Sequence, residues 1–440
     1  MGPKAYTIPV FDLLMSLGTA IDLLSPRLSG HHMRVAYISL ALATTLKLDD
    51  LERRQLVIAA MIHDIGAFTE AERIELLRFE ADDNDVHATV GFEFLRRFPL
   101  FREIAQIVRF HHLDWADGRG STQSGESVPR MSHLLHLADR VDAAVGPERH
   151  ILVQADNIRR RIESGQGAKF RPDHVGAFLQ LSRYESFWLD LTFPNLEVFL
   201  ARDTSLGELK LSIEQLTELA QLFCHLIDFK SPYTATHSSG VAATAAAIAG
   251  HCGFSTLEQR EIAVSGLLHD LGKLALPAEI LNKPAALTDE EFSSVQAHAY
   301  YSKRMLEGIR DLATIVGWGC AHHERLDGRG YPFHDSVDEL PLGARIVAVA
   351  DVLTALSEDR PYRGGMTQSQ VVQVLEEMAG GGKLDGQLVA LVREHFDDIQ
   401  QRRSSSQRAA SSTYRELAAR LPLPSVDRAH PRAAISADQL

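Results

Sequence analysis

The sequence contains very few cysteines, which excludes two common ways of stabilising a fold. Cys224, Cys252 and Cys320 are the three cysteines among 440 residues, and they lie far apart in the chain. An odd number at this spacing gives neither a disulfide framework nor a zinc site built from cysteine pairs. We expect each to be a small buried apolar side chain in a cytoplasmic protein, because the cytosol keeps thiols reduced.

Long apolar runs and an excess of basic residues are also absent. The most apolar stretch, residues 241–250, is shorter than the roughly 18 residues of a membrane helix, and the N-terminus does not resemble a signal peptide. With 45 basic and 58 acidic side chains the formal net charge is −13, whereas general DNA or membrane-surface binders present a positive face. We therefore expect no DNA and no membrane partner. A small anion is still compatible, because metal ions can reverse the field inside a pocket.

Aromatic residues make up only 7% of the chain, and alternating strand patterns are scarce. Helical periodicity extends over nearly the whole sequence, which is rich in alanine and leucine. Residue pairs typical of capping boxes at helix starts precede apolar periods at four places: Asp49 with Glu52, Ser205 with Glu208, Ser255 with Glu258, and Thr288 with Glu291. The predicted fold class is all-α.

The histidines reveal an internal repeat. The N-terminal half has the order His31, His63-Asp64, His87, His111-His112, Asp139, and the C-terminal half has His237, His269-Asp270, His298, His322-His323, Asp351. Successive landmarks are 32, 24, 24 and 28 residues apart in the first half and 32, 29, 24 and 29 in the second. Local contexts agree as well, MIHDIG with LLHDLG and HHLDWADGRG with HHERLDGRG. We infer a duplicated domain.

The repeat divides the chain into two tandem helical domains, at residues 1–145 and 211–400. Residues 146–210 lack the histidine pattern but contain apolar and aromatic side chains, which predicts a packed helical connector. Beyond residue 400 the sequence turns to QQRRSSSQRAASS and then to several prolines, a composition typical of disorder. We expect residues 401–440 to form a disordered tail, apart from a short helix near residues 414–421.

Histidine and aspartate without cysteine are the ligand types of divalent metals such as iron, manganese or zinc. An adjacent His-Asp pair cannot aim both side chains at one point from mid-helix, because successive residues diverge by about 100°. Gly66 and Gly272 follow the two pairs, so we expect each pair where a helix ends and the backbone turns. An aspartate can bridge two ions, which together activate a bridging hydroxide and hold a phosphoryl group.

Nine further histidines have no counterpart in the repeat. We interpret them as core or surface residues without a function: His133, His136, His150, His174, His225, His251, His334, His395 and His430.

At these landmarks the sequence resembles the HD superfamily of metal-dependent phosphohydrolases. The second half is similar to its HD-GYP branch, the bacterial cyclic di-GMP phosphodiesterases, through the stretches YTATHSSGVA, GLLHDLGKLALPAEILNKPAALTDEE, HHERLDGRGYP and LPLGARIVAVADVLTALSEDRPYR. These stretches cover most of residues 230–365. The resemblance implies a cyclic-dinucleotide phosphodiesterase of bacterial second-messenger signalling.

The resemblance also implies the ligands of a binuclear metal centre in the second half. One ion would be held by His237, His269, Asp270 and Asp351, and the other by Asp270, His298, His322 and His323. Some family members hold a third ion through a glutamate four residues before the first histidine. Tyr233 stands at that position here, so we expect two ions, of iron, manganese or zinc. The family also usually has an aspartate three residues after the last ligand, where this chain has Thr354, and this alters the surroundings of the metals.

Further residues of the family's active site have counterparts in the second half. Lys273, of the HDxGK motif, would contact a phosphate oxygen. Lys273 and Asp270, which would bridge the two ions, are the predicted catalytic residues. Arg360 and Arg363 match a phosphate-binding arginine pair, although a solvated helix end is the alternative interpretation. Gly330, Tyr331 and Pro332 form the GYP loop. In the family this loop shapes the mouth of the site and is a candidate contact for diguanylate cyclase domains.

The first half resembles a generic HD domain without the GYP features. It retains a complete set of potential metal ligands: His31, His63, Asp64, His87, His111, His112 and Asp139. However, Ala67 stands where the second half has Lys273, and Ser121-Thr122 replaces Tyr-Pro. Three roles remain open for this domain: a second phosphohydrolase that acts on a terminal phosphomonoester (5′-nucleotidase-like), a nucleotide or metal sensor, and a packing partner with a vestigial site.

The sequence thus predicts hydrolysis of a 3′,5′-cyclic dinucleotide to a linear dinucleotide in the second domain. Cyclic di-GMP, cyclic GMP-AMP and a linear oligonucleotide are the substrates left open. The alternative from another class is a non-catalytic cyclic-dinucleotide receptor or signalling scaffold. The complete ligand set and Lys273 favour the enzyme, because a receptor does not need to activate water. The oligomeric state, a homodimer included, is not determined by the sequence.

Overall fold

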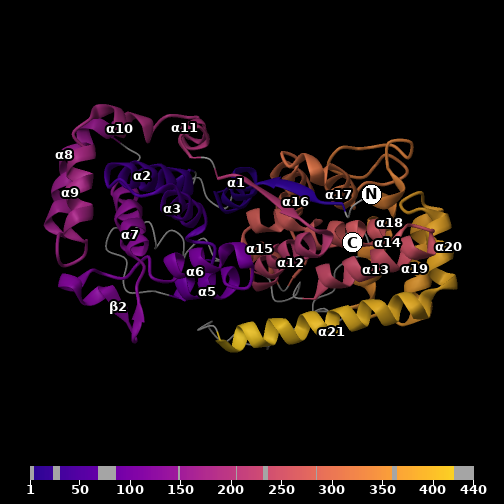
Figure 1. Ribbon diagram of the computed structural model, residues 1–440. Helices are drawn as coiled ribbons and strands as arrows, with labels where there is room; N and C mark the ends of the chain where they lie inside the picture. Colours follow the sequence, from indigo (N-terminus) through magenta and orange to yellow (C-terminus); the bar gives the residue numbers. More distant parts are fainter. Residues whose placement is uncertain are drawn as a thin grey trace. The chain divides into compact units, whose positions relative to one another are not determined.

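The computed structural model describes residues 4–22, 30–67, 86–146, 149–204, 206–230, 236–283, 285–358 and 364–420. The chain forms two compact units, residues 9–208 and residues 1–8 with 209–440. Both units are built from helices (Figure 1), and the strands of the described part form two small two-stranded sheets, β1 with β4 and β2 with β3. The all-α prediction is confirmed. Among the described helices, none combines the length and apolarity that crossing a bilayer requires.

The unit of residues 9–208 contains the first half of the repeat. Its elements are α1 (Val10–Asp22), α2 (His31–Thr45), α3 (Asp50–Ile62), α5 (Val86–Leu95), a 3-10 helix (Pro99–Phe101), α6 (Arg102–Arg109), a 3-10 segment (Ala116–Ser121), β2 (Thr122–Gln123), β3 (Glu126–Ser127), α7 (Arg130–Ala143), α8 (Ile151–Ser164), α9 (Pro172–Leu181), α10 (Glu185–Asp190) and α11 (Leu196–Asp203).

Residues 146–210 are not a separate connector in this structure. Helices α9 and α11 both pack on α2, and the Tyr37 hydroxyl on α2 donates a 2.6 Å hydrogen bond to Asp190 of α10. Phe178, Phe187 and Trp188 are buried and contact one another edge to face. This aromatic cluster extends the core of the N-terminal domain, and α8–α11 are therefore part of that domain.

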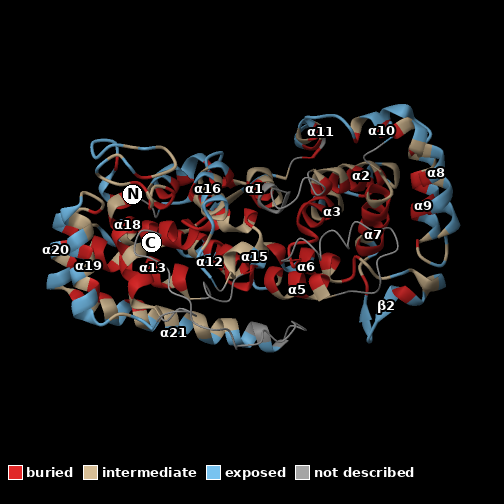
Figure 2. Cartoon of the chain, turned by 180° about the vertical axis from the view of Figure 1, so that it is seen from behind, coloured by how far each residue is buried: buried red, intermediate tan, exposed pale blue. Residues whose placement is uncertain are grey.

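The other unit contains the second half of the repeat. Its elements are β1 (Tyr6–Pro9, whose last residue lies in the first unit), β4 (Glu208–Leu211), α12 (Ile213–Lys230), α13 (His237–His251), α14 (Thr256–Leu268), a 3-10 helix (Leu271–Ala275), α15 (Ala278–Leu281), α16 (Asp289–Leu306), a 3-10 helix (Arg310–Leu312), α17 (Ala313–Gly319), α18 (Leu342–Ser357), α19 (Gln368–Gly380), α20 (Gly386–Glu394) and α21 (Phe396–Arg420). Helices α13 and α18 lie at the centre of its core and appear mostly buried in Figure 2.

Helix α21 contradicts the expectation of disorder from residue 401 onward. It continues without a break from Phe396 to Arg420 and packs along α13. Figure 1 shows it in yellow near the C-terminal end of the chain. Ile399 and Arg403 are buried against the domain, and the ring of Tyr414 lies 4.6 Å from that of Phe229 on α12. Tertiary packing therefore stabilises a segment whose polar composition alone predicts disorder. Residues 421–440 lie outside the described part.

Three of the four predicted capping boxes are present. Asp49, Ser255 and Thr288 each accept a hydrogen bond from the backbone of the glutamate three residues later, and that glutamate bonds back. The pair Ser205 and Glu208 is different: Glu208 begins strand β4, and Ser205 lies outside the described residues. The confirmed boxes on α3 and α14 fix the starts of the two helices that lead into the His-Asp pairs.

Candidate metal centres

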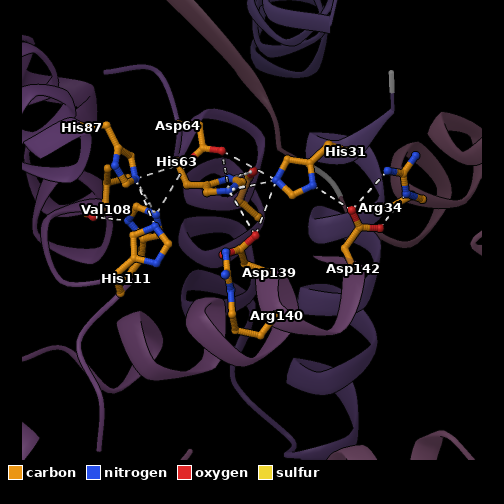
Figure 3. Close-up of polar contacts among 12 residues, drawn as sticks. His31, Arg34, His63, Asp64, His87, Val108, His111, Asp139, Arg140 and Asp142 are labelled. Carbon is orange, nitrogen blue, oxygen red and sulfur yellow. Dashed lines mark hydrogen bonds and ion pairs between the residues drawn. The ribbon is translucent and has the colours of Figure 1, made fainter. Parts of the chain in front are cut away.

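The structure brings the distant landmarks of the first half together in the core of its domain (Figure 3). His31 is the first residue of α2, and His63-Asp64 follows the last residue of α3. His87 lies on α5, His111 follows α6, and Asp139 lies on α7. All of these side chains are buried. Five separate segments thus direct titratable groups to one point, as the repeat predicts.

Asp64 lies between two groups of histidines. Its Oδ2 atom is 3.7 Å from His31 Nε2 and 3.4 Å from His63 Nε2. Its Oδ1 atom is 3.4 Å from His87 Nε2 and 3.7 Å from His111 Nε2. Each carboxylate oxygen therefore faces a different pair of imidazoles, which is the arrangement required of a ligand that bridges two ions.

Asp270 has the same position in the second domain. Its Oδ2 atom is 3.2 Å from His269 Nε2, whereas Oδ1 is 3.2 Å from His298 Nε2 and 3.9 Å from His322 Nε2. Asp351 on α18 completes the first group, since its Oδ1 atom is 3.0 Å from Nε2 of His237 and 3.9 Å from Nε2 of His269.

Four sets of side chains have ligand atoms that all lie within 4.8 Å of one another. They are His31, His63 and Asp64; Asp64, His87, His111 and His112; His237, His269 and Asp270; and His298, His322 and His323. Each domain thus contains two adjacent sets, and these sets can hold divalent metal ions. All fourteen potential metal ligands named from the repeat lie in or beside these sets.

Unpaired buried atoms support the fit of these residues to metal ions. Within the described residues, Oδ1 of Asp64, Oδ1 of Asp270 and Nε2 of His269 are buried and have no hydrogen bond. Leaving such atoms without a partner is costly, and cations bound in the two clusters would satisfy them.

The protonation of several histidines also suits metal binding. Burial lowers the pKa of His63 and of His323 to about 3, and neighbouring histidines add to this effect. The pKa values of His112 and His322 are lowered well below the ordinary value by the same causes. These imidazoles are neutral near pH 7, so a ring nitrogen is available as a ligand.

Gly66 and Gly272 are required by close backbone contact, a reason that differs from the predicted turn. A Cβ atom at Gly66 would lie 2.1 Å from the carbonyl oxygen of His87. A Cβ atom at Gly272 would lie 2.0 Å from the carbonyl oxygen of His298. Neither contact is possible, so these glycines allow the His-Asp pair and the next histidine helix to approach each other. The predicted helix ends are confirmed, because α3 and α14 stop directly before the pairs.

The GYP loop contacts a candidate ligand directly. The ring of Tyr331 stacks on that of His323 with centroids 4.6 Å apart, and the Tyr331 amide donates to the His323 carbonyl at 3.2 Å. Gly330 is needed there, because a Cβ atom would lie 2.4 Å from the Arg325 nitrogen. The Tyr331–Pro332 peptide bond is cis. The loop thus holds the imidazole of His323 in place.

Lys273 is paired with the carboxylate of Asp270. Its Nζ atom donates to Oδ2 of Asp270 at 2.6 Å, and its side chain remains 20% exposed. Thr354, at the position of the family's usual second aspartate, is buried and lies 3.4 Å from the Thr244 hydroxyl. Arg360, Arg363 and Tyr233 lie outside the described residues.

Arg140 and His136 also lie near the N-terminal centre, although the repeat assigns them no role. Arg140 is buried and donates to Oδ2 of Asp139 through Nε at 3.1 Å and Nη2 at 2.6 Å, leaving Oδ1 toward His31 and His63 (Figure 3). His136, assigned no function above, is also buried, with its ring 6.1 Å from that of His112. Its spacing of three residues before Asp139 on one helix was the available signal.

Replacing Arg140 with alanine is expected to destabilise the N-terminal domain by about 3–5 kcal/mol, because it leaves a buried carboxylate without its partner. The matched control is Arg130→Ala, which breaks an exposed 3.1 Å ion pair with Asp173 and should cost no more than about 1 kcal/mol. Urea unfolding of the chelator-treated proteins measures both. Equal, small changes would show that Asp139 does not depend on Arg140.

Comparison with known proteins agrees with this duplicated architecture. The HD domain family matches the chain twice, over residues 28–144 and residues 219–388. A 3′3′-cGAMP-specific phosphodiesterase of Vibrio cholerae (number 1 of that organism) is 30% identical over 372 residues, covering 82% of this chain and 86% of its own. Another from the same organism (number 3) is 28% identical over 424 residues, covering 84% and 91%.

Two further similarities concern a shorter part of the chain and the fold. A cyclic di-GMP phosphodiesterase of Pseudomonas aeruginosa is 42% identical over 149 residues, 34% of this chain and 36% of its own. The crystal structure of a cyclic GMP-AMP specific phosphodiesterase of V. cholerae has a TM-score of 0.60 to this chain at 23% identity, covering 93% of this chain and 98% of the other. At that identity the similarity shows a shared fold.

Two helical domains with buried His-Asp clusters define an enzyme of the metal-dependent HD class. The chain belongs, more narrowly, to the HD-superfamily phosphodiesterases that contain two HD domains.

Proposed function

We propose that the second domain hydrolyses a 3′,5′-cyclic dinucleotide to a linear dinucleotide at a binuclear metal centre of the HD-GYP type. The observation that carries the proposal is the placement of Asp270, whose two oxygens face two separate histidine groups. In this assignment His237, His269, Asp270 and Asp351 hold one ion, and Asp270, His298, His322 and His323 hold the other. Iron, manganese or zinc bound there would polarise the phosphoryl group and lower the pKa of the attacking water.

We further propose 3′3′-cyclic GMP-AMP as the preferred substrate. The two V. cholerae relatives that align over 82% and 84% of this chain are both named as specific for 3′3′-cGAMP. The P. aeruginosa relative named for cyclic di-GMP aligns over 34% of the chain, within the range of one domain. Relatives that share the two-domain arrangement therefore favour the mixed dinucleotide, with cyclic di-GMP as the alternative.

The residues around the centre have distinct roles in this reaction. Lys273 is partly exposed beside Asp270, so its ammonium group can meet a non-bridging phosphate oxygen as negative charge develops there. Tyr331 holds the His323 ring by stacking on it. Arg360 and Arg363 are the proposed further contacts to phosphate, in bidentate geometry. The GYP loop, Gly330, Tyr331 and Pro332, is also the proposed contact for a diguanylate cyclase domain.

The test is product formation by the full chain, supplied with manganese or iron(II) under reducing conditions and offered each cyclic dinucleotide separately. We expect a linear dinucleotide from both, formed faster from 3′3′-cyclic GMP-AMP. Chromatographic separation with initial rates measures the ratio. If the protein binds the ligands but releases no linear product, it is a receptor rather than an enzyme. A higher kcat/KM with cyclic di-GMP would contradict the substrate preference alone.

Lys273→Ala is expected to lower kcat by roughly 10²–10³-fold, the usual effect of removing one group that stabilises a developing charge. Lys283→Ala is the matched control, because Lys283 pairs with Glu291 at the start of α16 and has no proposed role. Steady-state kinetics with saturating metal measure both variants. An unchanged kcat with a raised KM would assign Lys273 to substrate binding only.

We propose that the first domain also binds metal ions, through His31, His63, Asp64, His87, His111, His112 and Asp139. The same division of carboxylate oxygens around Asp64 supports this assignment. Hydrolysis of a terminal phosphomonoester is the activity proposed for this site, with the sensor role as the alternative. The same chromatography tests it, because loss of a 5′-phosphate from the linear product separates from ring opening. No dephosphorylated product would favour the sensor.

A further inference from the structure

His237 is held from outside the proposed metal centre by a glutamate at the end of α18. Its Nε2 atom faces Asp351 at 3.0 Å, and its other ring nitrogen, Nδ1, lies 3.0 Å from Oε2 of Glu358. A carboxylate at this place fixes the tautomer and the ring orientation of a ligating histidine. Glu358 lies within the stretch LPLGARIVAVADVLTALSEDRPYR, but the sequence pattern assigns it no role.

The need for this support follows from the place of His237 in its helix. His269, His298 and His322 each hold Nδ1 on the backbone carbonyl three residues earlier, at 2.7, 2.6 and 2.7 Å. His237 is the first residue of α13, so no preceding turn of its own helix offers a carbonyl. A side chain from another element has to replace it.

The N-terminal domain solves the same problem with a different pair of residues. His31 is the first residue of α2, and its Nδ1 atom lies 2.7 Å from Oδ2 of Asp142, three residues after Asp139. Arg34, three residues after His31, donates to Asp142 through Nε at 2.6 Å and Nη2 at 3.1 Å. Figure 3 shows this Arg34–Asp142–His31 row leading to the cluster.

Both supporting residues of the first domain are replaced in the second. Thr354 stands three residues after Asp351, where its hydroxyl lies 3.4 Å from that of Thr244, and Gly240 stands three residues after His237. A Cβ atom at Gly240 would lie 2.6 Å from Nε2 of Gln407 on α21. The missing arginine side chain therefore leaves the space that Gln407 occupies.

Gln407 connects α21 to the glutamate. Its Nε2 atom donates to Oε1 of Glu358 and, at 3.4 Å, to the carbonyl of Thr236, the residue before His237. Arg403, one turn earlier and buried, donates to Oε1 of Gln407. The row of side chains from Arg403 through Gln407 and Glu358 to His237 thus parallels the row from Arg34 through Asp142 to His31.

We propose that Glu358 and Gln407 are positioning residues that replace the Asp142–Arg34 pair, so that helix α21 is part of the C-terminal metal centre. The proposal rests on the metal centre assigned under the proposed function. It gives the helix a task beyond packing: it keeps the His237 imidazole turned toward the site through the carboxylate of Glu358.

The experiment measures manganese affinity directly, by competition with a chromogenic chelator, in full-length protein. An Asp64→Ala background removes the N-terminal centre from the titration. We expect Glu358→Ala to weaken manganese binding roughly 10–100-fold, as for other partners of ligating histidines, and Gln407→Ala to weaken it less. Glu358→Gln should lie between wild type and Glu358→Ala, because the amide oxygen still accepts from the ring but carries no charge.

Gln401→Ala is the matched control, since Gln401 is an exposed glutamine on the same helix. A second readout is thermal unfolding with and without manganese. A role in packing alone would lower the melting temperature of the metal-free protein and leave the rise caused by manganese unchanged. We expect the reverse for Glu358→Gln, with a smaller metal-induced rise and a melting temperature near that of the control without metal.

Transplanting the solution of the first domain supplies a rescue. Thr354→Asp, added to Glu358→Ala, places a carboxylate at the position that Asp142 has in the other half, and should recover most of the lost affinity. If Glu358→Ala and Glu358→Gln both bind manganese as tightly as their background, Glu358 has no positioning role. A different result would contradict the proposed function itself. If Asp64→Ala binds no manganese, and if Asp270→Ala binds as much manganese as the wild type, the second domain holds no metal centre, and this inference fails together with the proposed function.

Discussion

Asp270→Ala is expected to abolish ring opening of the cyclic dinucleotide, whereas Asp64→Ala should retain most of it. The two aspartates occupy equivalent positions in the repeat, and each presents its two oxygens to two histidine groups. The difference comes from the surroundings, because the second domain alone has Lys273 beside the bridging carboxylate and Tyr331 against His323. Each variant is therefore the matched control of the other.

The expected loss in Asp270→Ala is roughly 10³-fold or more, because in the proposed assignment both ions would share this ligand and several charge-stabilising contacts would depend on it. Initial rates with 3′3′-cyclic GMP-AMP and cyclic di-GMP, at saturating manganese, measure the effect. Circular dichroism and thermal unfolding verify that each variant is folded. Equal losses in the two variants would show that the two centres act as one functional unit, contrary to the assignment of ring opening to the second domain.

Removal of metal is expected to lower activity to the uncatalysed background and to lower the stability of the fold. The clusters are buried and contain atoms without hydrogen bonds in the described structure, such as Oδ1 of Asp64 and Oδ1 of Asp270. Ions that bind the folded chain and not the unfolded one stabilise it by about 2.7 kcal/mol per site at a hundredfold excess over Kd. Chelation should therefore cause a melting shift as well as inactivation.

The measurement is a thermal unfolding curve and a product assay on the same chelated and desalted sample. Manganese, iron(II) and zinc are then added back separately. Each ion that binds should restore thermal stability, whereas the activity that returns should differ from one ion to another. Asp64→Ala and Asp270→Ala each remove one centre, so each should show a smaller metal-induced shift than wild type. Full activity after exhaustive chelation, with the metal content verified as zero, would contradict the assignment of a metal-dependent centre.

The candidate metal ligands could be named from the sequence because the same pattern of residues occurs in it twice. The spacing of His31, His63 and Asp139 repeats in His237, His269 and Asp351, and two helical domains of similar sequence place equivalent residues alike. The same types of ligand in both halves also indicate the same class of metal ion. The helix ends at the His-Asp pairs followed from the divergence of neighbouring side chains, although the need for Gly66 came from a close contact with His87 that only the structure shows.

The residues that hold the candidate ligands in place, such as Arg140 and Gln407, could not be predicted in the same way. Arg140 is adjacent to Asp139 in sequence, yet nothing in the pattern indicates that it is buried against that carboxylate. Gln407 lies in a serine-rich segment whose composition predicts disorder, and its helix forms because α13 and α12 offer a surface to pack on. Composition reports local preference, whereas these contacts join residues far apart in the chain.

Helix α21 also separates the moments at which the two centres are completed during synthesis. Domains of a growing chain fold from the N-terminus onward. The N-terminal centre has its ligands and their supports once Asp142 has been made, since Arg34 precedes it. In the C-terminal domain the last proposed ligand along the chain is Asp351, whereas Gln407 comes 56 residues later. A ribosome that stops between Asp351 and Gln407 would release a polypeptide that has every proposed metal ligand but lacks Gln407, one of the two proposed positioning residues.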